Sequence, residues 1–244
     1  MATTSEEIRV SVPLDTSSTV KPRAARVLLI DNHPIVREGL RRIIENEDDL
    51  LVCGEADTVR DARSAIAASR PDVIVADITL KQGDGIDLVR DVRAHYPNLP
   101  ILVLSVYDEA VYAERMLSVG ASGYLTKQAT SEQILLSLRR VIDGGVYVSE
   151  AVGYNMIRRL YAGRRPVPAN PIDRLSNREL QILHLVGRGL SSREAASSLN
   201  LSIKTVESHR QRIKGKLNLR SGTQLVQYAI NWFVAENGGT RVGV

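Results

Sequence analysis

The sequence has very little cysteine and no long hydrophobic run, and each absence narrows the possibilities. Its 244 residues include one cysteine, Cys53, so no disulfide forms within the chain, as is typical of proteins in a reducing cytoplasm. No apolar run approaches the roughly 18 residues that a membrane-spanning helix requires. Residues 1–21 are rich in serine and threonine and lack the apolar stretch of a secretory signal. We therefore expect a cytoplasmic protein with a mobile tail over residues 1–25 and no membrane partner.

Length and charge predict two domains with different partners. A chain of this length with 43% hydrophobic residues can form one large or two ordinary domains with packed cores. Residues 26–142 contain 14 basic and 18 acidic side chains, whereas residues 172–220 contain 10 basic and 4 acidic ones. The net charges are therefore −4 and +6. A basic region of this kind is typical of nucleic-acid binding.

The first part of the chain alternates apolar runs with segments of helical periodicity. Val73, Ile74 and Val75 form an uninterrupted apolar run that ends on Asp77, which is typical of a strand covered on both faces. Strands are predicted over residues 26–30, 50–56, 73–77, 100–105 and 123–126. Helices are predicted over residues 34–44, 58–69, 85–95, 108–117 and 130–142. This order predicts an α/β domain with a doubly wound, flavodoxin-like sheet of five parallel strands.

Polar side chains stand at the carboxyl ends of four predicted strands. They are Asp31, Asp77, Ser105 and Lys127. Parallel strands bring these ends to one edge of the sheet, where ligands bind in such folds. Carboxylate oxygens suit Mg²⁺, and a cation with a lysine would neutralise a phosphoryl group in transfer. For Asp77 alone, an aspartate that only caps the next loop is an equally good explanation, whereas four such groups together favour a reactive site.

Residues 26–143 resemble the receiver domain of bacterial two-component response regulators. The matching stretches are Leu-Leu-Ile-Asp31-Asn32-His-Pro, Pro-Asp-Val-Ile-Val-Ala-Asp77-Ile-Thr79-Leu, Gly83-Asp84-Gly85, Leu104-Ser105 and Gly123-Tyr124-Leu-Thr-Lys127. The resemblance implies that Asp77 accepts a phosphoryl group from the phosphohistidine of a sensor histidine kinase. It implies a Mg²⁺ site at Asp31, Asn32, Asp77 and Thr79, the last through its backbone carbonyl. It assigns switch and phosphate contacts to Ser105, Tyr124 and Lys127, with Tyr124 rotating inward when Ser105 moves.

Three positions depart from the receiver pattern. At one of them Gln128 follows Lys127 where the family has a proline, so a cis peptide bond is not expected there. The family usually has two consecutive acids where this chain has Asp31-Asn32, and the second acid is normally a direct metal ligand. Asn32 offers a neutral amide carbonyl oxygen in place of the charged carboxylate of the usual acid, so Mg²⁺ is expected to bind more weakly. Lys81 stands where a proline is common and adds positive charge near the pocket. These changes keep open an atypical receiver that signals without phosphorylation.

Residues 144–171 are predicted to be a linker. Gly144 and Gly145 end the last helix of the first domain, and a helix is predicted over residues 149–161. The segment 163–171 contains three prolines and is expected to be extended and semi-rigid. The two domains would then keep separate cores and could change their relative placement.

The last part of the chain predicts a smaller all-α domain over residues 172–237. Two capping boxes, Ser176-Asn-Arg-Glu179 and Ser191-Ser-Arg-Glu194, each begin a helix. The four predicted helices cover residues 176–186, 191–199, 203–217 and 223–233. The short turn before the third helix is typical of a helix-turn-helix unit.

The third helix of this domain has one apolar and one polar face. Val206, Ile213 and Leu217 recur at helical spacing and are expected in the core. Residues 204–216 contain five basic side chains and one glutamate. Such a helix can enter the major groove and present polar groups to base edges. A merely solvated basic helix is the alternative, which the turn and caps disfavour.

This domain resembles the LuxR/NarL-type DNA-binding domain. The resemblance rests on Leu175-Ser-Asn-Arg-Glu179, Gly187-Arg-Gly189, Ala195-Ala196, Leu199, Lys204-Thr-Val-Glu-Ser-His-Arg210 and Lys216-Leu217. It implies that Glu207, Ser208 and Gln211 approach bases. It implies that Lys204, Thr205, His209, Arg212 and Lys216 mainly contact phosphates.

In this family the last helix pairs with a second copy of the chain. Here it would do so, close the small core, or do both with different side chains. Residues 238–244 would fray.

Together these features predict a DNA-binding response regulator. A sensor histidine kinase would phosphorylate Asp77, and this would control dimerisation, through the receiver or the last helix or both, and binding to double-stranded promoter DNA. In a closed state the receiver would cover the Val206 helix. The alternative is a receiver that works as a phosphorylation-independent dimerisation or ligand-sensing module. A phosphotransferase enzyme is disfavoured because Thr79 stands where its second catalytic acid would be.

Overall fold

The computed structural model describes residues 23–80, 85–161 and 171–236. Several sequence predictions fall wholly or largely outside this range. They are the tail before residue 23, the role of Lys81, the extended segment from residue 163 and the frayed end after residue 237. In the described part, no helix is long and apolar enough to cross a bilayer.

The first domain alternates five strands and five helices, as predicted. The elements are β1 Ala25–Ile30, α1 Pro34–Glu45, β2 Leu50–Ala56, α2 Val59–Ser69, β3 Val73–Ala76, α3 Gly85–His95, β4 Ile101–Ser105, α4 Glu109–Ser118, β5 Gly123–Thr126 and α5 Ser131–Ile142. All strand pairs are parallel, in the order β2-β1-β3-β4-β5. The doubly wound five-stranded sheet is therefore confirmed.

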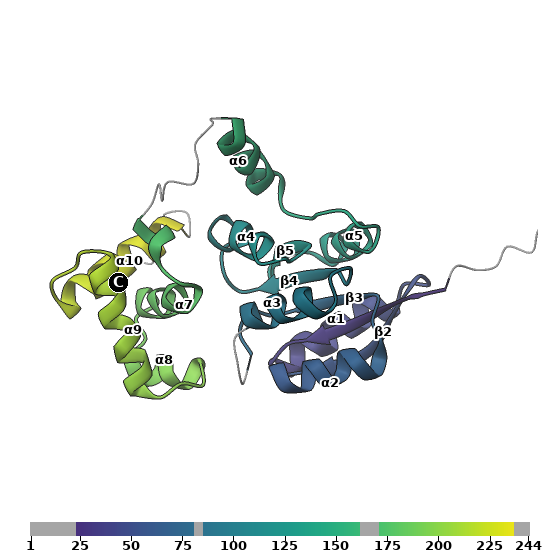
Figure 1. Cartoon of the computed structure of the whole chain (residues 1–244), viewed down its shortest axis with the longest axis horizontal. Coiled ribbons are helices and arrows are strands. Elements are labelled where there is room, and N and C mark those ends of the chain that lie inside the picture. The colour runs from purple at the N-terminus through teal and green to yellow at the C-terminus, as the bar shows by residue number, and fades with distance from the viewer. Residues whose placement is uncertain (1–22, 81–84, 162–170, 237–244) are drawn as a thin grey trace, which may run out of the picture.

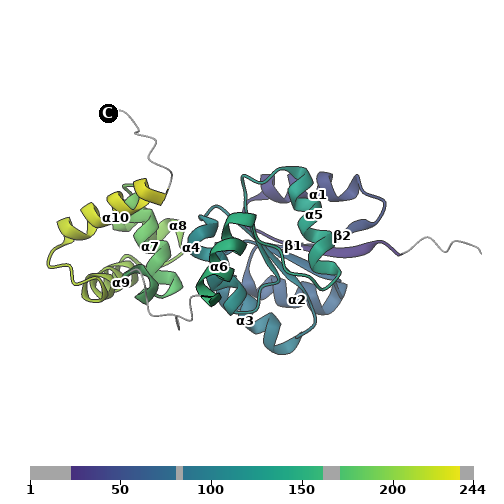
Figure 2. The same ribbon diagram turned by 90° about the horizontal axis from the view of Figure 1, so that it is seen from above.

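Helices cover both faces of this sheet because apolar side chains of one strand alternate between them. In β1, Val27 and Leu29 belong to the core shared with α1 and α5, whereas Leu28 and Ile30 pack in the core shared with α2, α3 and α4. Figure 2 shows α1 and α5 on one side of the sheet and α2 and α3 on the other. This burial on both sides leaves the strand ends as the accessible edge, where polar side chains can converge.

The rest of the described chain is helical. It comprises α6 Glu150–Tyr161, the 3₁₀ helix η1 Pro171–Arg174, α7 Asn177–Gly187, α8 Ser192–Ser198, α9 Ile203–Lys216 and α10 Gly222–Glu236. The four helices predicted for the second domain are confirmed. η1 was not predicted, because it begins at a proline that the sequence pattern assigns to the linker. In Figure 1, α7 to α10 form a separate unit beside α3 and α4, and α6 lies above α4.

Local capping fixes where the helices of the second domain begin. Ser176 and Ser191 both form complete capping boxes, with Glu179 and Glu194 as the reciprocal partners. Gly187 ends α7 where a Cβ atom would lie 2.6 Å from the carbonyl oxygen of Ala229. Glycine is therefore required there for α7 and α10 to pack against each other.

Candidate functional site

Three charged side chains meet where β1, β3 and β5 end. The ammonium Nζ of Lys127 lies 2.6 Å from Asp31 Oδ2 and 2.8 Å from Asp77 Oδ2. Both aspartates are almost fully buried, with 3% and 2% of their surface exposed. The fold thus brings together residues separated by up to 96 positions, because β1, β3 and β5 share one sheet and one direction.

Burial dominates the electrostatics of Asp77. Loss of hydration raises its pKa, the nearby Lys127 ammonium lowers it, and the second carboxylate at Asp31 raises it. The net effect is a pKa of Asp77 above the usual value, because burial and the second carboxylate outweigh the attraction of Lys127. A further cation in this pocket would favour the ionised, nucleophilic form of Asp77.

The oxygen donors around Asp77 fit a hard cation. Asn32 Oδ1 and Thr79 Oγ1 are buried and have no hydrogen-bond partner among the described residues. The backbone N–H of Thr79 donates to Asp77 Oδ1 at 3.2 Å. Carboxylate and amide oxygens are the donors that Mg²⁺ accepts. The residues present therefore suit the predicted metal, while the roles of Asn32 and of the Thr79 carbonyl as ligands stay predictions.

His33 is a pocket residue that the sequence reasoning missed. Its Nδ1 lies 3.1 Å from Asp31 Oδ1, 3.4 Å from Lys127 Nζ and 3.9 Å from Asp77 Oδ2. One ligand atom each from Asp31, His33 and Asp77 can lie within 4.8 Å of one another. Only its position in the sequence could have indicated this role, since His33 follows Asp31 by two residues in the loop after β1.

Ser105 and Tyr124 lie side by side beneath this edge, and neither is exposed. The backbone N–H of Tyr107 donates to Ser105 Oγ at 3.4 Å, and the Tyr124 hydroxyl donates to the backbone carbonyl of Tyr107 at 2.8 Å. Tyr124 is therefore already inside the domain in this structure. Its proposed rotation, like the phosphate contact of Ser105, stays a prediction.

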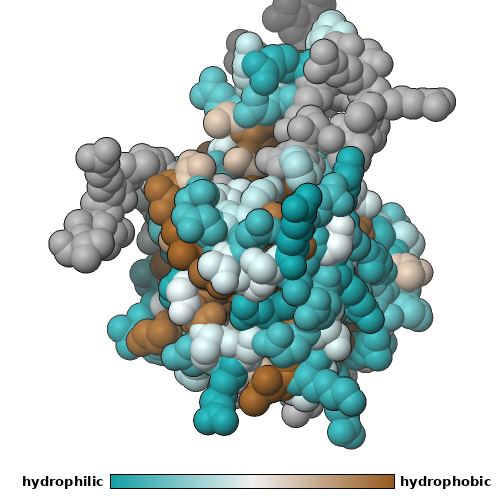
Figure 3. Space-filling view, turned by 90° about the vertical axis from the view of Figure 1, so that its left-hand side faces the viewer, coloured by the Kyte–Doolittle hydropathy of each residue, from teal (hydrophilic) through white to brown (hydrophobic). Residues whose placement is uncertain are grey.

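The outward face of α9 is open. Ser202 caps the helix, and Val206 and Ile213 are buried while Leu217 follows as its C-cap. The exposed predicted DNA contacts are Lys204, Glu207, Ser208, Gln211, Arg212 and Lys216, and Thr205 and His209 are half-buried. Gly215 is also exposed, and a Cβ there would meet nothing within 4 Å. In Figure 3 the side that includes this domain is mainly hydrophilic, with scattered hydrophobic patches.

Two of these side chains are tied to neighbouring helices. Lys216 Nζ donates to Glu179 Oε2 at 2.6 Å, which links the end of α9 to the start of α7. Ser192 of α8 donates to Glu207, and Arg210 donates to Ser192 Oγ at 2.8 Å. Both links hold α9 in place. Glu207 and Lys216 therefore have structural partners in addition to their predicted DNA contacts.

His209 is partly withdrawn from solvent. Burial, reinforced by Arg212, lowers its pKa, and its Nδ1 is buried without a hydrogen-bond partner among the described residues. A neutral imidazole contacts phosphate only as a hydrogen-bond donor and adds no positive charge. The predicted phosphate contact of His209 is thus expected to depend on hydrogen bonding.

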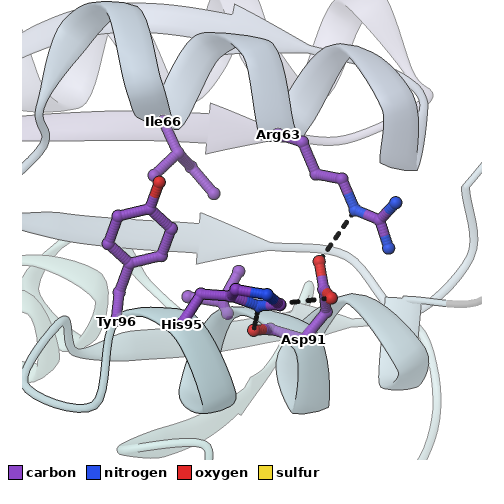
Figure 4. Close-up of a pocket in the computed structure, with 6 residues that line it drawn as sticks. Arg63, Ile66, Asp91, His95 and Tyr96 are labelled. Atoms are coloured by element: carbon purple, nitrogen blue, oxygen red, sulfur yellow. Dashed lines mark hydrogen bonds and ion pairs between the residues drawn. The ribbon is translucent and has the colours of Figure 1, made fainter.

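A hollow of about 250 Å³ lies between α2 and α3, away from the residues described above. Figure 4 shows Arg63, Asp91 and His95 at its wall, with Arg63 Nε 2.7 Å from Asp91 Oδ2. His95 Nδ1 lies 2.8 Å from the backbone carbonyl of Asp91. Arg63 and His95 both bind Asp91 there, and the hollow contains none of the predicted site residues.

Comparisons with known proteins match both halves of the chain. Residues 27–139 match the family described as response regulator receiver domain, and residues 173–229 match bacterial regulatory proteins of the luxR family. The oxygen regulatory protein NreC of Staphylococcus aureus is 32% identical over 209 residues, which cover 84% of this chain and 96% of that protein.

Solved structures extend the similarity to the whole architecture. The RcsB response regulator of Salmonella typhimurium has a TM-score of 0.62 and 26% identity, covering 86% of this chain and 98% of that one. RcsB from Salmonella enterica serovar Typhimurium, bound to a promoter in the presence of the phosphomimetic BeF₃⁻, has a TM-score of 0.59 and 26% identity, covering 86% and 100%.

Proposed function

The chain belongs to the response regulators that join a receiver domain to a LuxR-type DNA-binding domain, and from this premise we propose that phosphorylation of Asp77 controls its binding to promoter DNA. The phosphoryl donor is the phosphohistidine of a sensor histidine kinase. The protein works in the cytoplasm as a transcription regulator and not as an enzyme. The receiver spans residues 26–143, the linker residues 144–171 and the DNA-binding domain residues 172–237.

One observation carries this proposal: Lys127 bridges Asp31 and Asp77 in a buried pocket of a chain that also presents a basic helix to solvent. In the transfer, an Asp77 carboxylate oxygen attacks phosphorus, the P–N bond breaks, and its electron pair returns to the imidazole of the kinase. Lys127 and Ser105 pair with the phosphoryl oxygens. Asp31, Asn32, Asp77 and Thr79 would hold Mg²⁺, which would supply charge neutralisation when bound.

DNA is bound by α9, which lies in the major groove. Glu207, Ser208 and Gln211 approach base edges, and the flanking basic side chains meet phosphates. A homodimer presents two such helices to two half-sites. The exposed side chains of Ile230 and Val234 on α10 offer an apolar surface for the second copy, and the receiver is the other surface for pairing.

The proposal is tested by labelling and DNA binding of the full chain. Acetyl phosphate with Mg²⁺ is expected to add one phosphoryl group at Asp77, detected by intact mass. The labelled protein is expected to bind a duplex selected from a random pool about tenfold more tightly, within the usual range of allosteric coupling. Labelling with no change in DNA affinity or in oligomeric mass would contradict phosphorylation control.

An Asn32→Asp protein is expected to label at lower Mg²⁺ concentration. The substitution restores a second acid beside Asp31, and an added cation contact of roughly 1.4 kcal/mol corresponds to about a tenfold shift in half-saturating Mg²⁺. The measurement is the labelling rate across a Mg²⁺ titration. Asn98→Asp makes the same chemical change at an exposed loop position and is expected to match the wild type. An unchanged midpoint for Asn32→Asp would remove Asn32 from the metal site.

An Arg212→Ala protein is expected to bind all duplexes more weakly. Arg212 is exposed on the outward face of α9, and loss of one phosphate contact lowers the slope of log affinity against log salt by about 1. Gln211→Ala is expected instead to relax sequence preference with the salt slope unchanged. Arg60→Ala, on the exposed surface of α2, is the control. Equal salt slopes for Arg212→Ala and Arg60→Ala would exclude the phosphate contact.

A second candidate function follows from Asn32. With one acid missing and Lys127 already bonded to both aspartates, the receiver could serve as a phosphorylation-independent dimerisation or ligand-sensing module. A phosphate-affinity gel separates the two functions. A retarded band in wild type but not in Asp77→Ala supports phosphorylation, whereas identical mobility with normal DNA binding supports the second function.

A further inference from the structure

Arg115 of α4 binds the segment with which the DNA-binding domain begins. Its Nη2 donates to the carbonyl of Ile172 at 2.9 Å, and its Nη1 donates to the carbonyl of Leu175 at 2.8 Å. The side chain oxygen of Asn177 is a longer partner at 3.4 Å. One guanidinium thus holds η1 and the first residue of α7. Figures 1 and 2 both show α4 next to α7.

A second contact between the receiver and the DNA-binding domain is aromatic. The rings of Tyr107 and Tyr112 stack with centroids 4.7 Å apart, and the Tyr107 ring meets His184 of α7 edge to face at 4.9 Å. Tyr107 is 2% exposed and His184 is 9% exposed. Burial, reinforced by Arg188, lowers the pKa of His184 to about 4, so at neutral pH an uncharged ring packs against the receiver.

Tyr107 also touches both switch residues of the receiver through its backbone. Its N–H donates to Ser105 Oγ, and its carbonyl accepts the Tyr124 hydroxyl. A displacement of Ser105 toward a phosphoryl group at Asp77 would break or pull on this bond. Because Tyr107 is closely packed, such a displacement would also move its ring and change its contact with His184.

On the other side, His184 packs against the last helix. Its ring centroid lies 5.1 Å from that of Phe233 and 6.3 Å from that of Trp232. The outward face of α9 is meanwhile open. The contact seen here therefore differs from the closed state expected from sequence, in which the receiver covers α9. The receiver instead contacts η1 and α7, and His184 of α7 in turn contacts α10.

We propose that Tyr107 and Arg115 form a docking surface on the receiver for η1 and α7, through which the state of the Asp77 pocket reaches α10. The unphosphorylated protein is docked, and phosphorylation releases the contact. Tyr107 and Arg115 are positioning residues, since they act on α10 through His184 and η1. The coupling rests on the proposed phosphorylation of Asp77, whereas the docking contact itself does not.

Trp232 provides a native reporter, because it is the only tryptophan of the chain and lies beside His184. Adding acetyl phosphate and Mg²⁺ to the full-length wild type is expected to shift Trp232 emission at the rate at which Asp77 is labelled. Asp77→Ala is expected to show no shift. Stoichiometric labelling of Asp77 with unchanged emission would overturn the coupling while leaving the proposed function standing.

Arg115→Ala tests the docking contact without phosphorylation. Its unlabelled form is expected to show the emission of labelled wild type, and the change on labelling to fall about fivefold or more, the lower end of allosteric coupling. Arg90→Ala removes an exposed receiver arginine that pairs with Asp87 on its own helix and is expected to behave as wild type. Emission of Arg115→Ala equal to that of Arg90→Ala would overturn the proposal.

Arg115→Lys separates positioning from folding. Lysine keeps the charge and length but lacks the planar fork that reaches two carbonyls at once. It is expected to fold with wild-type helix content by circular dichroism and still to lose most of the docked emission. Full restoration of the docked emission by lysine would overturn the role of the two-carbonyl contact. Failure of labelling in wild type would contradict the proposed function, and the comparison of unlabelled Arg115→Ala with Arg90→Ala would still decide the docking.

Discussion

An Asp77→Asn protein is expected to take up no phosphoryl group from acetyl phosphate, a complete loss of the reaction. The amide has nearly the shape of the carboxylate but lacks a nucleophilic oxygen anion. Asp31, the other buried carboxylate of the pocket, is bonded to Lys127 and His33 and is not expected to replace it. Intact mass after incubation with Mg²⁺ and donor measures the result.

The loss is not expected to come from unfolding. Two buried carboxylates share one lysine in this pocket, and neutralising one of them removes a repulsion, so the thermal midpoint is expected to stay equal or rise. Asp87→Asn, at an exposed position on α3, is the matched control and is expected to label as wild type does. Labelling of Asp77→Asn at the wild-type rate would place the acceptor elsewhere.

The pocket could be predicted because its information is local to each strand end. Val73, Ile74 and Val75 predict a buried strand, and the residue that follows a parallel strand must lie at the reactive edge. Repeating this for β1 and β5 yields Asp31 and Lys127 without any knowledge of their distances. The same logic predicted the capping boxes, since Ser176 and Glu179 are three residues apart in one turn of helix.

Contacts between distant segments could not be predicted in this way. No pattern in the sequence pairs Arg115 with the carbonyls of Ile172 and Leu175, because a backbone acceptor can belong to any type of residue. Lys216 was assigned to phosphate by the resemblance to LuxR-type domains, whereas the fold also gives it Glu179 as a partner. His33 was overlooked because its contact with Lys127 joins residues 94 positions apart in the sequence. Each depends on how elements pack, which periodicity does not encode.

A Glu179→Ala protein is expected to lose stability in the DNA-binding domain by about 2–3 kcal/mol, combining a lost helix cap with a lost charged hydrogen bond. Glu179 is 2% exposed, and its Oε2 accepts both the Ser176 backbone N–H at 2.7 Å and Lys216 Nζ at 2.6 Å. Removal frees the start of α7 and the end of α9 together. Urea unfolding followed by Trp232 fluorescence reports on this domain, because Trp232 lies in α10.

Glu194→Ala is the matched control, because Glu194 completes the same capping box at an exposed position of α8. Its loss is expected to be smaller. The contribution of Glu179 also depends on pH: burial raises the pKa of Glu179, but Lys216 and the Ser176 N–H outweigh burial and hold it below the usual 4.5. A carboxyl whose pKa is lower in the folded state stabilises the fold above its unfolded pKa, and this stabilisation disappears as pH falls through the folded pKa. The difference between wild type and Glu179→Ala is therefore expected to be full at pH 7 and to shrink below about pH 4.5; a difference that persists there would show that packing, and not the ion pair, joins α9 to α7.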